Sequence, residues 1–225
     1  MKVLEQMSEY GHEEVAFWHD ARASYRGIIA IHSSALGPAL GGTRFWHYGS
    51  EQEALVDVLR LSRSMTYKAA VTGLSLGGGK SVIIGDPKTE QREPIFRAHG
   101  RFVDSLKGRY ITAEDVGTTV ADMDYVQLET PFVTGSENGS GDPSPVTAYG
   151  TYRGIKACAL ERWGDDSLEG RRIAVQGAGH VGYHLCGYLA EEGADIVVTD
   201  IDEARVRTVV AELGARPVGP DAIYD

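Results

Sequence analysis

Two lysines lie in a segment of small and apolar residues, MTYKAAVTGLSLGGGKSVIIGD, which spans residues 65–86. Lys68 is followed by two alanines, and Lys80 follows three glycines. If both side chains face one dry cleft, their repulsion and the loss of water lower the pKa of one of them. Such a pair would supply a fixed ammonium that binds a carboxylate and an amine that acts as a general base. The alternative is two exposed lysines on loops beside a buried strand.

An acidic residue at the end of a predicted strand could exchange protons with these lysines. The sequence RYITAEDVGTT at 109–119 places Glu114 and Asp115 directly after a strand predicted at 110–113. A carboxyl group buried there could move protons to and from a substrate. The structural alternative makes Asp115 a cap of the turn ahead of Gly117. The pattern alone does not separate Glu114 from Asp115.

A glycine loop in the second half of the chain has the spacing of a dinucleotide-binding turn. Residues 177–182 read GAGHVG, follow an apolar strand and open a predicted helix. Gly177 permits a tight turn, Gly179 lets the backbone approach a pyrophosphate, and Gly182 lets the helix pack on the strand. The free N–H groups of the helix N-terminus favour the phosphates.

Asp200 ends the next predicted strand, where a carboxylate can accept hydrogen bonds from an adenosine ribose. Because it would repel a 2′-phosphate, the predicted cofactor is NAD rather than NADP. The other interpretation is a glycine turn in a βαβ unit that binds nothing. The predicted cofactor-binding residues here are Gly177, Gly179, His180, Val181, Gly182 and Asp200.

Two further motifs fail on spacing or composition. Residues 73–81 resemble a P-loop, but its pattern requires glycine where Leu74 stands. His180 and His184 are four residues apart, as in some helical zinc sites, but no glutamate lies between them as in H-E-x-x-H. We therefore expect neither a nucleoside triphosphate site nor a bound metal.

The composition is that of a globular protein. The chain has 225 residues and a net charge of −10, which argues against nucleic acid or an anionic membrane as a partner. No apolar run approaches the ~18 residues of a spanning helix, and the N-terminus is too polar for a signal peptide. Two cysteines, Cys158 and Cys186, make no disulfide framework, which fits a reducing cytosol.

Alternating strand-like and helical segments indicate an α/β protein with parallel strands. Residues 135–144 are rich in turn formers and separate two halves. We expect a first domain at 1–135, a linker at 136–144 and a second domain at 145–225. Predicted strands are 24–34, 40–46, 81–86, 110–113, 132–135, 171–177, 195–200 and 215–218; predicted helices are 51–64, 91–106, 119–129, 145–160 with Ser144 as its N-cap, 180–192 and 202–213.

Five segments together carry a family resemblance: GGTRFW at 41–46, residues 65–87, residues 108–119, PSPVTAYG at 143–150 and the glycine loop. In this order they resemble the leucine/phenylalanine/valine dehydrogenases, relatives of glutamate dehydrogenase. The resemblance implies reversible oxidative deamination of an L-amino acid to its 2-oxo acid and ammonia, with NAD as hydride acceptor.

The resemblance also implies roles for individual residues. Lys68 would bind the substrate carboxylate, Lys80 would activate the attacking water, and Asp115, rather than Glu114, would exchange protons with the amine. An apolar Leu40 and a small Ala113 would favour an aliphatic substrate such as leucine, valine or isoleucine, with phenylalanine as the alternative. The resemblance further assigns Leu40, Gly41, Gly42 and Ala113 to the substrate pocket and Thr147 to the nicotinamide amide.

Members of this family have longer chains. The resemblance therefore implies an N-terminal α/β substrate and oligomerisation domain followed by the first half of a Rossmann NAD domain. Two hypotheses follow: a dehydrogenase presented as a fragment, a short form or one part of a split protein, and a non-catalytic or truncated binding or assembly protein. A cytoplasmic homo-oligomer is expected, with strand 24–34 as the candidate for pairing between subunits.

Overall fold

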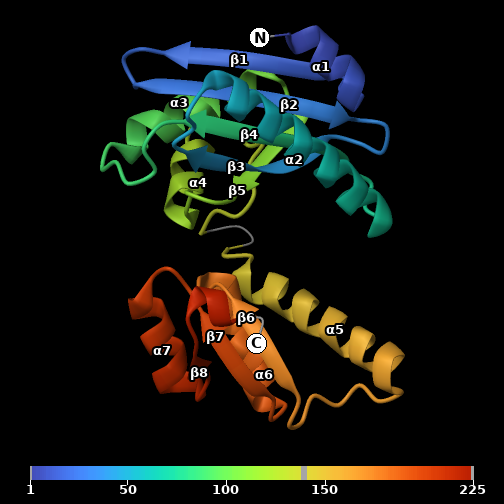
Figure 1. Cartoon of the computed structure of the whole chain (residues 1–225). Helices are drawn as coiled ribbons and strands as arrows, with labels where there is room; N and C mark the ends of the chain where they lie inside the picture. The colour runs from blue at the N-terminus through green and yellow to red at the C-terminus, as the bar shows by residue number, and fades with distance from the viewer. Residues whose placement is uncertain (1, 138–140, 224–225) are drawn as a thin grey trace. The chain divides into compact units, whose positions relative to one another are not determined.

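The computed structural model describes residues 2–137 and 141–223 and divides the chain into two compact units, Met1–Asp142 and Pro143–Asp225 (Figure 1). Each unit is an α/β fold with its own sheet and its own apolar core. Residues 138–140, inside the predicted linker, lie outside the described residues.

A five-stranded sheet forms the centre of the first unit. The parallel strands β3, β4 and β5 end at the same edge of this sheet, while β2 pairs antiparallel with β4, and β1 with β2. In α/β sheets, ligands bind beyond the carboxyl ends of such strands. The order is β1-β2-β4-β3-β5, with β1 (Glu14–Asp20), β2 (Tyr25–Ser33), β3 (Ala39–Trp46), β4 (Gly77–Ile84) and β5 (Tyr110–Glu114).

Helices cover both faces of this sheet (Figure 1). On one face, Leu55 of the long helix α2 packs in a buried cluster with Val82. On the other face, Phe96 of α3 and Met123 of α4 share a cluster with Ile83. Successive residues of β4 therefore pack in two different cores, one on each face of the sheet. The helices are α1 (Val3–Tyr10), α2 (Glu51–Val71), α3 (Arg92–Ser105) and α4 (Val120–Gln127).

Helix α2 begins where the sequence predicts and ends later. The Ser50 side chain caps it by accepting a hydrogen bond of 3.2 Å from the backbone N–H of Glu53. The helix continues past residue 64 to Val71, because no glycine or proline interrupts it before Gly73, which has a φ of 71°. Lys68 therefore belongs to the last turn of α2 and not to a loop.

The glycine run 77–79 forms the first part of β4, so this strand begins earlier than predicted. A Cβ at Gly78 would lie 2.0 Å from Thr66 Oγ1 of α2, and one at Gly79 would lie 2.7 Å from the Tyr110 ring. Glycine is required because α2 and β5 approach the strand this closely.

Two local predictions for the first unit are incomplete or wrong. The predicted strand at 132–135 is wrong, because Val133 forms only an isolated bridge with Thr112. Helix α1 and strand β1 are absent from the predictions. The sequence before residue 24 carries many polar residues and gives a weak periodic signal.

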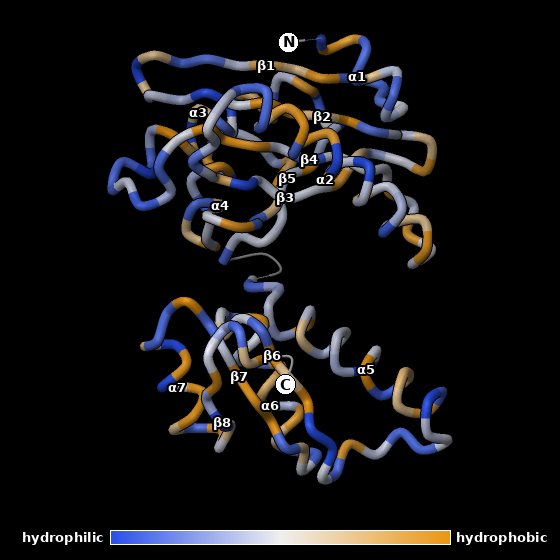
Figure 2. The backbone as a smooth tube through the Cα atoms, viewed as in Figure 1, coloured by the Kyte–Doolittle hydropathy of each residue, from blue (hydrophilic) through white to orange (hydrophobic). Residues whose placement is uncertain are grey.

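The second unit contains a three-stranded parallel sheet in the order β6-β7-β8. Strand β7 is apolar, as its colour in Figure 2 shows. The core of the unit includes Val198 of this strand, together with Leu189 and Val209 from two helices. Helix α5 begins at Ser144 with Pro143 as its N-cap, one residue earlier than predicted. The elements are α5 (Ser144–Trp163), β6 (Arg172–Gln176), α6 (His180–Glu191), β7 (Asp195–Thr199), α7 (Glu203–Leu213), β8 (Arg216–Pro217) and the 3₁₀ turn Pro220–Ala222.

Candidate active site

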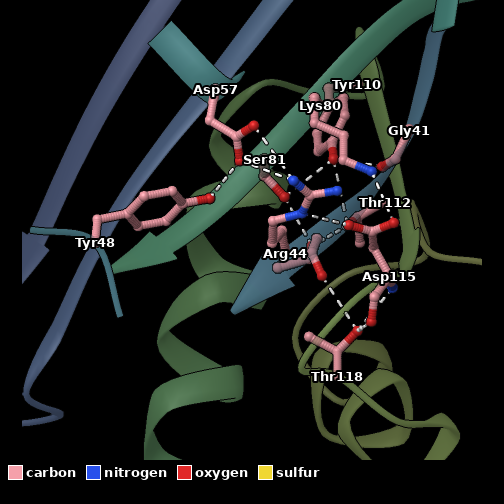
Figure 3. A network of polar contacts seen from close by, with 11 residues as sticks. Gly41, Arg44, Tyr48, Asp57, Lys80, Ser81, Tyr110, Thr112, Asp115 and Thr118 are labelled. Carbon is pink, nitrogen blue, oxygen red and sulfur yellow. Dashed lines mark hydrogen bonds and ion pairs between the residues drawn. The ribbon is translucent and has the colours of Figure 1, made fainter. Parts of the chain in front are cut away.

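Lys80 is buried in the middle of the first sheet. It lies on β4, and its side chain is 6% exposed. Strand alternation places it on the α2 face, together with Gly78 and Val82. Its Nζ lies 3.2 Å from Oδ1 of Asp115, which directly follows β5 (Figure 3). Because β3 separates β4 from β5, the two side chains meet over that strand.

Gly42 of β3 makes room for this contact. A Cβ there would lie 2.9 Å from Asp115 Cβ and 2.4 Å from the carbonyl oxygen of Glu114. The backbone N–H of Asp115 donates to Thr118 Oγ1 at 2.8 Å, and that hydroxyl lies 3.1 Å from the carbonyl oxygen of Thr43. The turn that carries Asp115 is therefore fixed to β3.

A second cation, Arg44, also binds Asp115. Its Nε donates to Asp115 Oδ2 at 3.0 Å, and its Nη1 donates to both carboxylate oxygens of Asp57, at 3.3 and 3.0 Å. The Tyr48 hydroxyl donates to Asp57 Oδ2 at 2.7 Å. The sequence analysis missed Arg44, Tyr48 and Asp57. The available signal was alternation, because Arg44 lies two residues after Gly42 and so on the same face of β3.

Burial and charge act in opposite directions on the central pair. Burial lowers the pKa of Lys80, Asp115 raises it and Arg44 lowers it, with a net pKa below the ordinary value. Burial raises the pKa of Asp115, but Lys80 and Arg44 outweigh burial and hold that pKa below its ordinary value. Asp115 is therefore a carboxylate at neutral pH, and Lys80 is shifted toward the neutral amine. The like charge beside Lys80 is that of Arg44, where the sequence suggested Lys68.

Lys68 occupies a different environment. It is exposed in the last turn of α2, and within the described parts of the chain its ammonium forms no ion pair. Thr66, two residues before it, contacts Gly78, two residues before Lys80. The two lysines thus come from segments that touch, but the dry surroundings expected for both hold for Lys80 only.

Glu114, the competing acid, belongs to the opposite face of β5 from Ala113 by strand alternation. The structure therefore brings Asp115, and not Glu114, to Lys80. Ala113 pairs with Gly42, and Leu40 pairs with Ile111. Leu40 and Ala113 are half-buried and share the face of Lys80.

Gly41 serves the other face of the sheet. A Cβ there would lie 1.7 Å from the carbonyl oxygen of Gly79, so glycine is needed for β3 and β4 to pair. The carbonyl oxygen of Gly41 accepts a hydrogen bond of 2.5 Å from the Tyr110 hydroxyl. Of the two glycines predicted for a pocket, Gly42 borders Asp115 and Gly41 supports the sheet.

A fully buried polar network lies on this second face, and the sequence analysis did not find it. Thr43 Oγ1 lies 2.7 Å from Ser81 Oγ, 2.6 Å from Thr112 Oγ1 and 2.8 Å from His99 Nε2, so it joins β3, β4, β5 and α3. His99 Nδ1 lies 2.8 Å from the Tyr25 hydroxyl. Burial lowers the pKa of His99 to about 3, which keeps the ring neutral. The network ties together the three strands that position the Lys80 site.

In the second unit, the glycine loop has the geometry that a dinucleotide turn needs. Gly177 has a φ of 102°, which favours glycine, and a Cβ at Gly182 would lie 1.9 Å from the Gly177 carbonyl oxygen. Oδ2 of Asp200 accepts a hydrogen bond of 2.6 Å from the backbone N–H of Ala178. Asp200 therefore holds the loop from the neighbouring strand.

A small pocket of about 180 Å³ lies at the carboxyl ends of β6 and β7, where open α/β sheets bind ligands. His180 is exposed and Val181 half-buried at the start of α6, and Thr147 is exposed in the first turn of α5. The open backbone around Gly179 and the carboxylate nearby fit a dinucleotide. The pocket is lined by Gln176, Gly177, Thr199, Asp200, Ile201 and Pro220.

The described residues contain no cluster of histidine, cysteine, aspartate and glutamate that could hold a metal ion. Across the same residues, no helix combines the length and the apolar character needed to cross a membrane. Cys158 is exposed and Cys186 buried, and both are free thiols.

Fold and sites together define a class: an α/β protein with a buried lysine–aspartate pair in one unit and a Rossmann-type glycine loop in the other. Residues 13–131 match the family model described as Glu/Leu/Phe/Val dehydrogenase, dimerisation domain. The chain belongs to the Glu/Leu/Phe/Val dehydrogenase family.

Similar proteins extend this match over the whole chain. Leucine dehydrogenase of Geobacillus stearothermophilus is 58% identical over 227 residues, which cover 100% of this chain and 62% of that protein. Valine dehydrogenase of Streptomyces virginiae is 54% identical over 199 residues, covering 87% of this chain and 56% of that protein. The crystal structure of L-tryptophan dehydrogenase from Nostoc punctiforme superposes with a TM-score of 0.72 at 43% identity, covering 99% of this chain and 63% of that one. The chain thus spans less than two thirds of the length of these relatives.

Proposed function

We propose that the protein containing this chain is an NAD-dependent dehydrogenase that converts an L-amino acid to its 2-oxo acid and ammonia. The observation that carries the proposal is the buried amino group of Lys80, whose Nζ lies 3.2 Å from Oδ1 of the Asp115 carboxylate. Membership of the family and the similarity to leucine and valine dehydrogenases support it.

In this proposal, the two central residues move protons at defined atoms. The Asp115 carboxylate accepts a proton from the substrate ammonium, and a hydride then leaves the α-carbon. Water adds to the resulting imine carbon while the neutral amine of Lys80 takes its proton. Asp115 then returns its proton to the amino nitrogen, and the C–N bond breaks with its electron pair going to nitrogen, which leaves as ammonia. The 2-oxo group forms as the hydroxyl on the same carbon gives its proton to the Asp115 carboxylate, which the preceding transfer has freed. The exposed ammonium of Lys68 is assigned to the substrate carboxylate.

The proposed substrate has an aliphatic side chain. Leu40 and Ala113 place apolar surface on the Lys80 face and carry no charge. Leucine, valine and isoleucine fit such surroundings, and phenylalanine is the alternative. One methylene changes selectivity by only ~1–3 kcal/mol, so these substrates are separated by measurement of kcat/KM.

The proposed cofactor is NAD, held by residues 177–182 and Asp200, with Thr147 assigned to the nicotinamide amide. When bound, NAD supplies the acceptor for the hydride. The loop offers backbone N–H groups to the pyrophosphate, and the Asp200 carboxylate favours a ribose with a free 2′-hydroxyl.

The proposal extends to the roles of the two domains, the oligomeric state and the location of the protein. Residues 1–135 would form the amino acid domain and residues 145–225 part of the NAD domain. A homo-oligomer in the cytoplasm is proposed, supported by the dimerisation domain named in the family model and by two free cysteines. Light scattering tests the oligomer; a monomer at micromolar concentration would contradict it.

The direct test is NADH formation, followed by absorbance, with leucine, valine, isoleucine, phenylalanine and glutamate. Aliphatic substrates are expected to give the highest kcat/KM, and Lys80→Ala to remove turnover. Lys88→Ala, an exposed lysine in the loop after β4, is the matched control and should retain it. A folded protein that binds NAD without turning over any amino acid would instead indicate a binding or assembly protein.

A further inference from the structure

Arg44 lies beside Asp115 but has no part in the chemistry proposed above. It binds Oδ2 of Asp115 at 3.0 Å, while Lys80 lies 3.2 Å from Oδ1. The two oxygens of one carboxylate are thus divided between two cations (Figure 3). A carboxylate held at one oxygen alone can rotate about its terminal bond, and the second contact removes that freedom.

Arg44 is in turn fixed from its other side. Asp57 of α2 binds it through both carboxylate oxygens, and the Tyr48 hydroxyl holds Asp57 from the segment between β3 and α2. The side chains of Arg44 and Asp57 are 24% and 28% exposed, so water screens this pair less than a surface ion pair. Helix α2, strand β3 and the Asp115 turn are therefore joined through one guanidinium.

A pocket of about 650 Å³ opens onto Arg44 and the residues that hold it. Arg44, Tyr48 and Asp57 line it together with Arg60. Water can enter the space that a shorter side chain at position 44 would leave. We therefore expect substitutions of Arg44 to leave the first unit folded.

Removal of the Arg44 guanidinium should shift the pKa values of its neighbours in a defined direction. The charged and titratable groups around Asp115 are Lys80 from β4, Arg44 from β3, Asp57 from α2, Tyr110 from β5 and Tyr48. Arg44 lowers the pKa of both Lys80 and Asp115. Without it, both pKa values rise.

We propose that Arg44 is a positioning residue of the deamination site: it holds Asp115 Oδ2 so that Oδ1 faces Lys80, and Asp57 and Tyr48 hold Arg44 in place. The inference rests on the proposed function, because the pair matters for turnover only in a dehydrogenase.

The kinetic test compares Arg44→Met, Arg44→Lys and Arg60→Met. Arg60 is an exposed cation of α2 that lines the same pocket and has no ion pair within the described residues, so it is a matched control. We expect kcat/KM to fall about 100-fold for Arg44→Met, about 10-fold for Arg44→Lys and less than about twofold for Arg60→Met. The rising limb of kcat/KM against pH is set by the pKa of Lys80, the proposed base. It should move to higher pH in Arg44→Met and remain near its original position in Arg44→Lys.

A second readout needs no turnover. In protein labelled with ¹³C at aspartate carboxyls, the Asp115 resonance is assigned by its loss in Asp115→Asn, and its titration is followed by NMR. The midpoint should rise in Arg44→Met and stay unchanged in Arg60→Met. An unchanged midpoint and an unchanged pH limb in Arg44→Met would overturn the inference about Arg44. Absence of amino acid turnover in the wild-type protein would overturn the proposed function, while the titration would still report on Arg44.

Discussion

Gly42 and Asp115 touch: a Cβ at Gly42 would lie 2.9 Å from Asp115 Cβ and 2.4 Å from the preceding carbonyl oxygen. Neither obstacle is the free end of a flexible chain, so Gly42→Ala must move the Asp115 turn. A shift of about 1 Å at a reacting group can cost about 100-fold in rate, and we expect a loss of that order in kcat/KM. Gly49→Ala is the control, because its Cβ would meet only the flexible carboxylate of Glu53 at 3.0 Å. Equal activity in the two variants would contradict this account.

Asp115→Asn should act on both rate and pH dependence. Loss of proton exchange with the substrate should lower kcat by about 100-fold or more. Asp115 raises the pKa of Lys80, so its removal lowers that pKa and moves the rising limb of the profile to lower pH. This shift is opposite in sign to the one expected for Arg44→Met. Glu114→Gln, on the other face of β5, is expected to leave the limb in place.

Two glycines of helix α6 form a matched pair for testing the cofactor loop. A Cβ at Gly182 would lie 1.9 Å from the Gly177 carbonyl oxygen, whereas one at Gly187 would meet nothing within 4 Å. Gly182→Ala should distort the loop and weaken NAD binding, measured by calorimetry. Gly187→Ala should bind NAD normally and gain up to about 1 kcal/mol in free energy of unfolding, because alanine favours the helix. Normal binding by Gly182→Ala would remove the loop from the cofactor site.

Asp200→Ala tests the choice between NAD and NADP. The change removes the hydrogen bond to Ala178 and the charge expected to repel a 2′-phosphate. The affinity for NAD should fall about tenfold, and the ratio of NADP to NAD activity should rise. Asp202→Ala removes the N-cap of α7, which accepts from Ala204 N–H at 2.9 Å, and should cost about 1 kcal/mol of stability without changing that ratio.

His99 gives the first unit a defined sensitivity to acid. Burial lowers its pKa to about 3 in the folded protein, against about 6.5 for an ordinary histidine. The unfolded chain therefore binds this proton first, so the stability is complete above about pH 6.5 and is lost as the pH falls toward 3, by up to about 1.4 kcal/mol per pH unit. Urea unfolding between pH 6.5 and 5 should show a shallower loss in His99→Gln. The exposed His19→Gln should keep the original slope; a matching slope in His99→Gln would refute the assignment.

The sequence predicted the elements that carry the strongest local signals. Strand 24–34, the capped start of α2 at Ser50 and the βαβ unit around GAGHVG all have periodicity or turn chemistry that acts within about ten residues. The glycine run before Lys80 was harder to assign to a strand, because glycine usually marks a turn. Only the close approach of Thr66 and Tyr110 explains why it lies inside β4.

The candidate site was predictable where it depended on residue type and family pattern, and less so where it depended on distant contacts. Lys80 and Asp115 were named from the sequence, but their meeting across β3 is a product of strand order. Arg44 and Asp57 lie 13 positions apart on different elements, and no local pattern pairs them. The exposure of Lys68 followed from the extra length of α2, which the helix prediction ended too early.

The buried network on the α3 face has a consequence for how the first unit exchanges protons with water. The six side chains of the network are fully buried, so water cannot reach their hydroxyl and ring protons in the closed fold. They are those of Tyr25, Thr43, Ser81, His99, Tyr110 and Thr112. Thr43 has one hydroxyl proton for three neighbours, so it can donate to one and must accept from the others. The orientation of one hydroxyl therefore constrains the rest across four strands, β2 to β5. Exchange of these protons with deuterium should be slow and should proceed at a single shared rate, because only an opening of the whole sheet releases any of them.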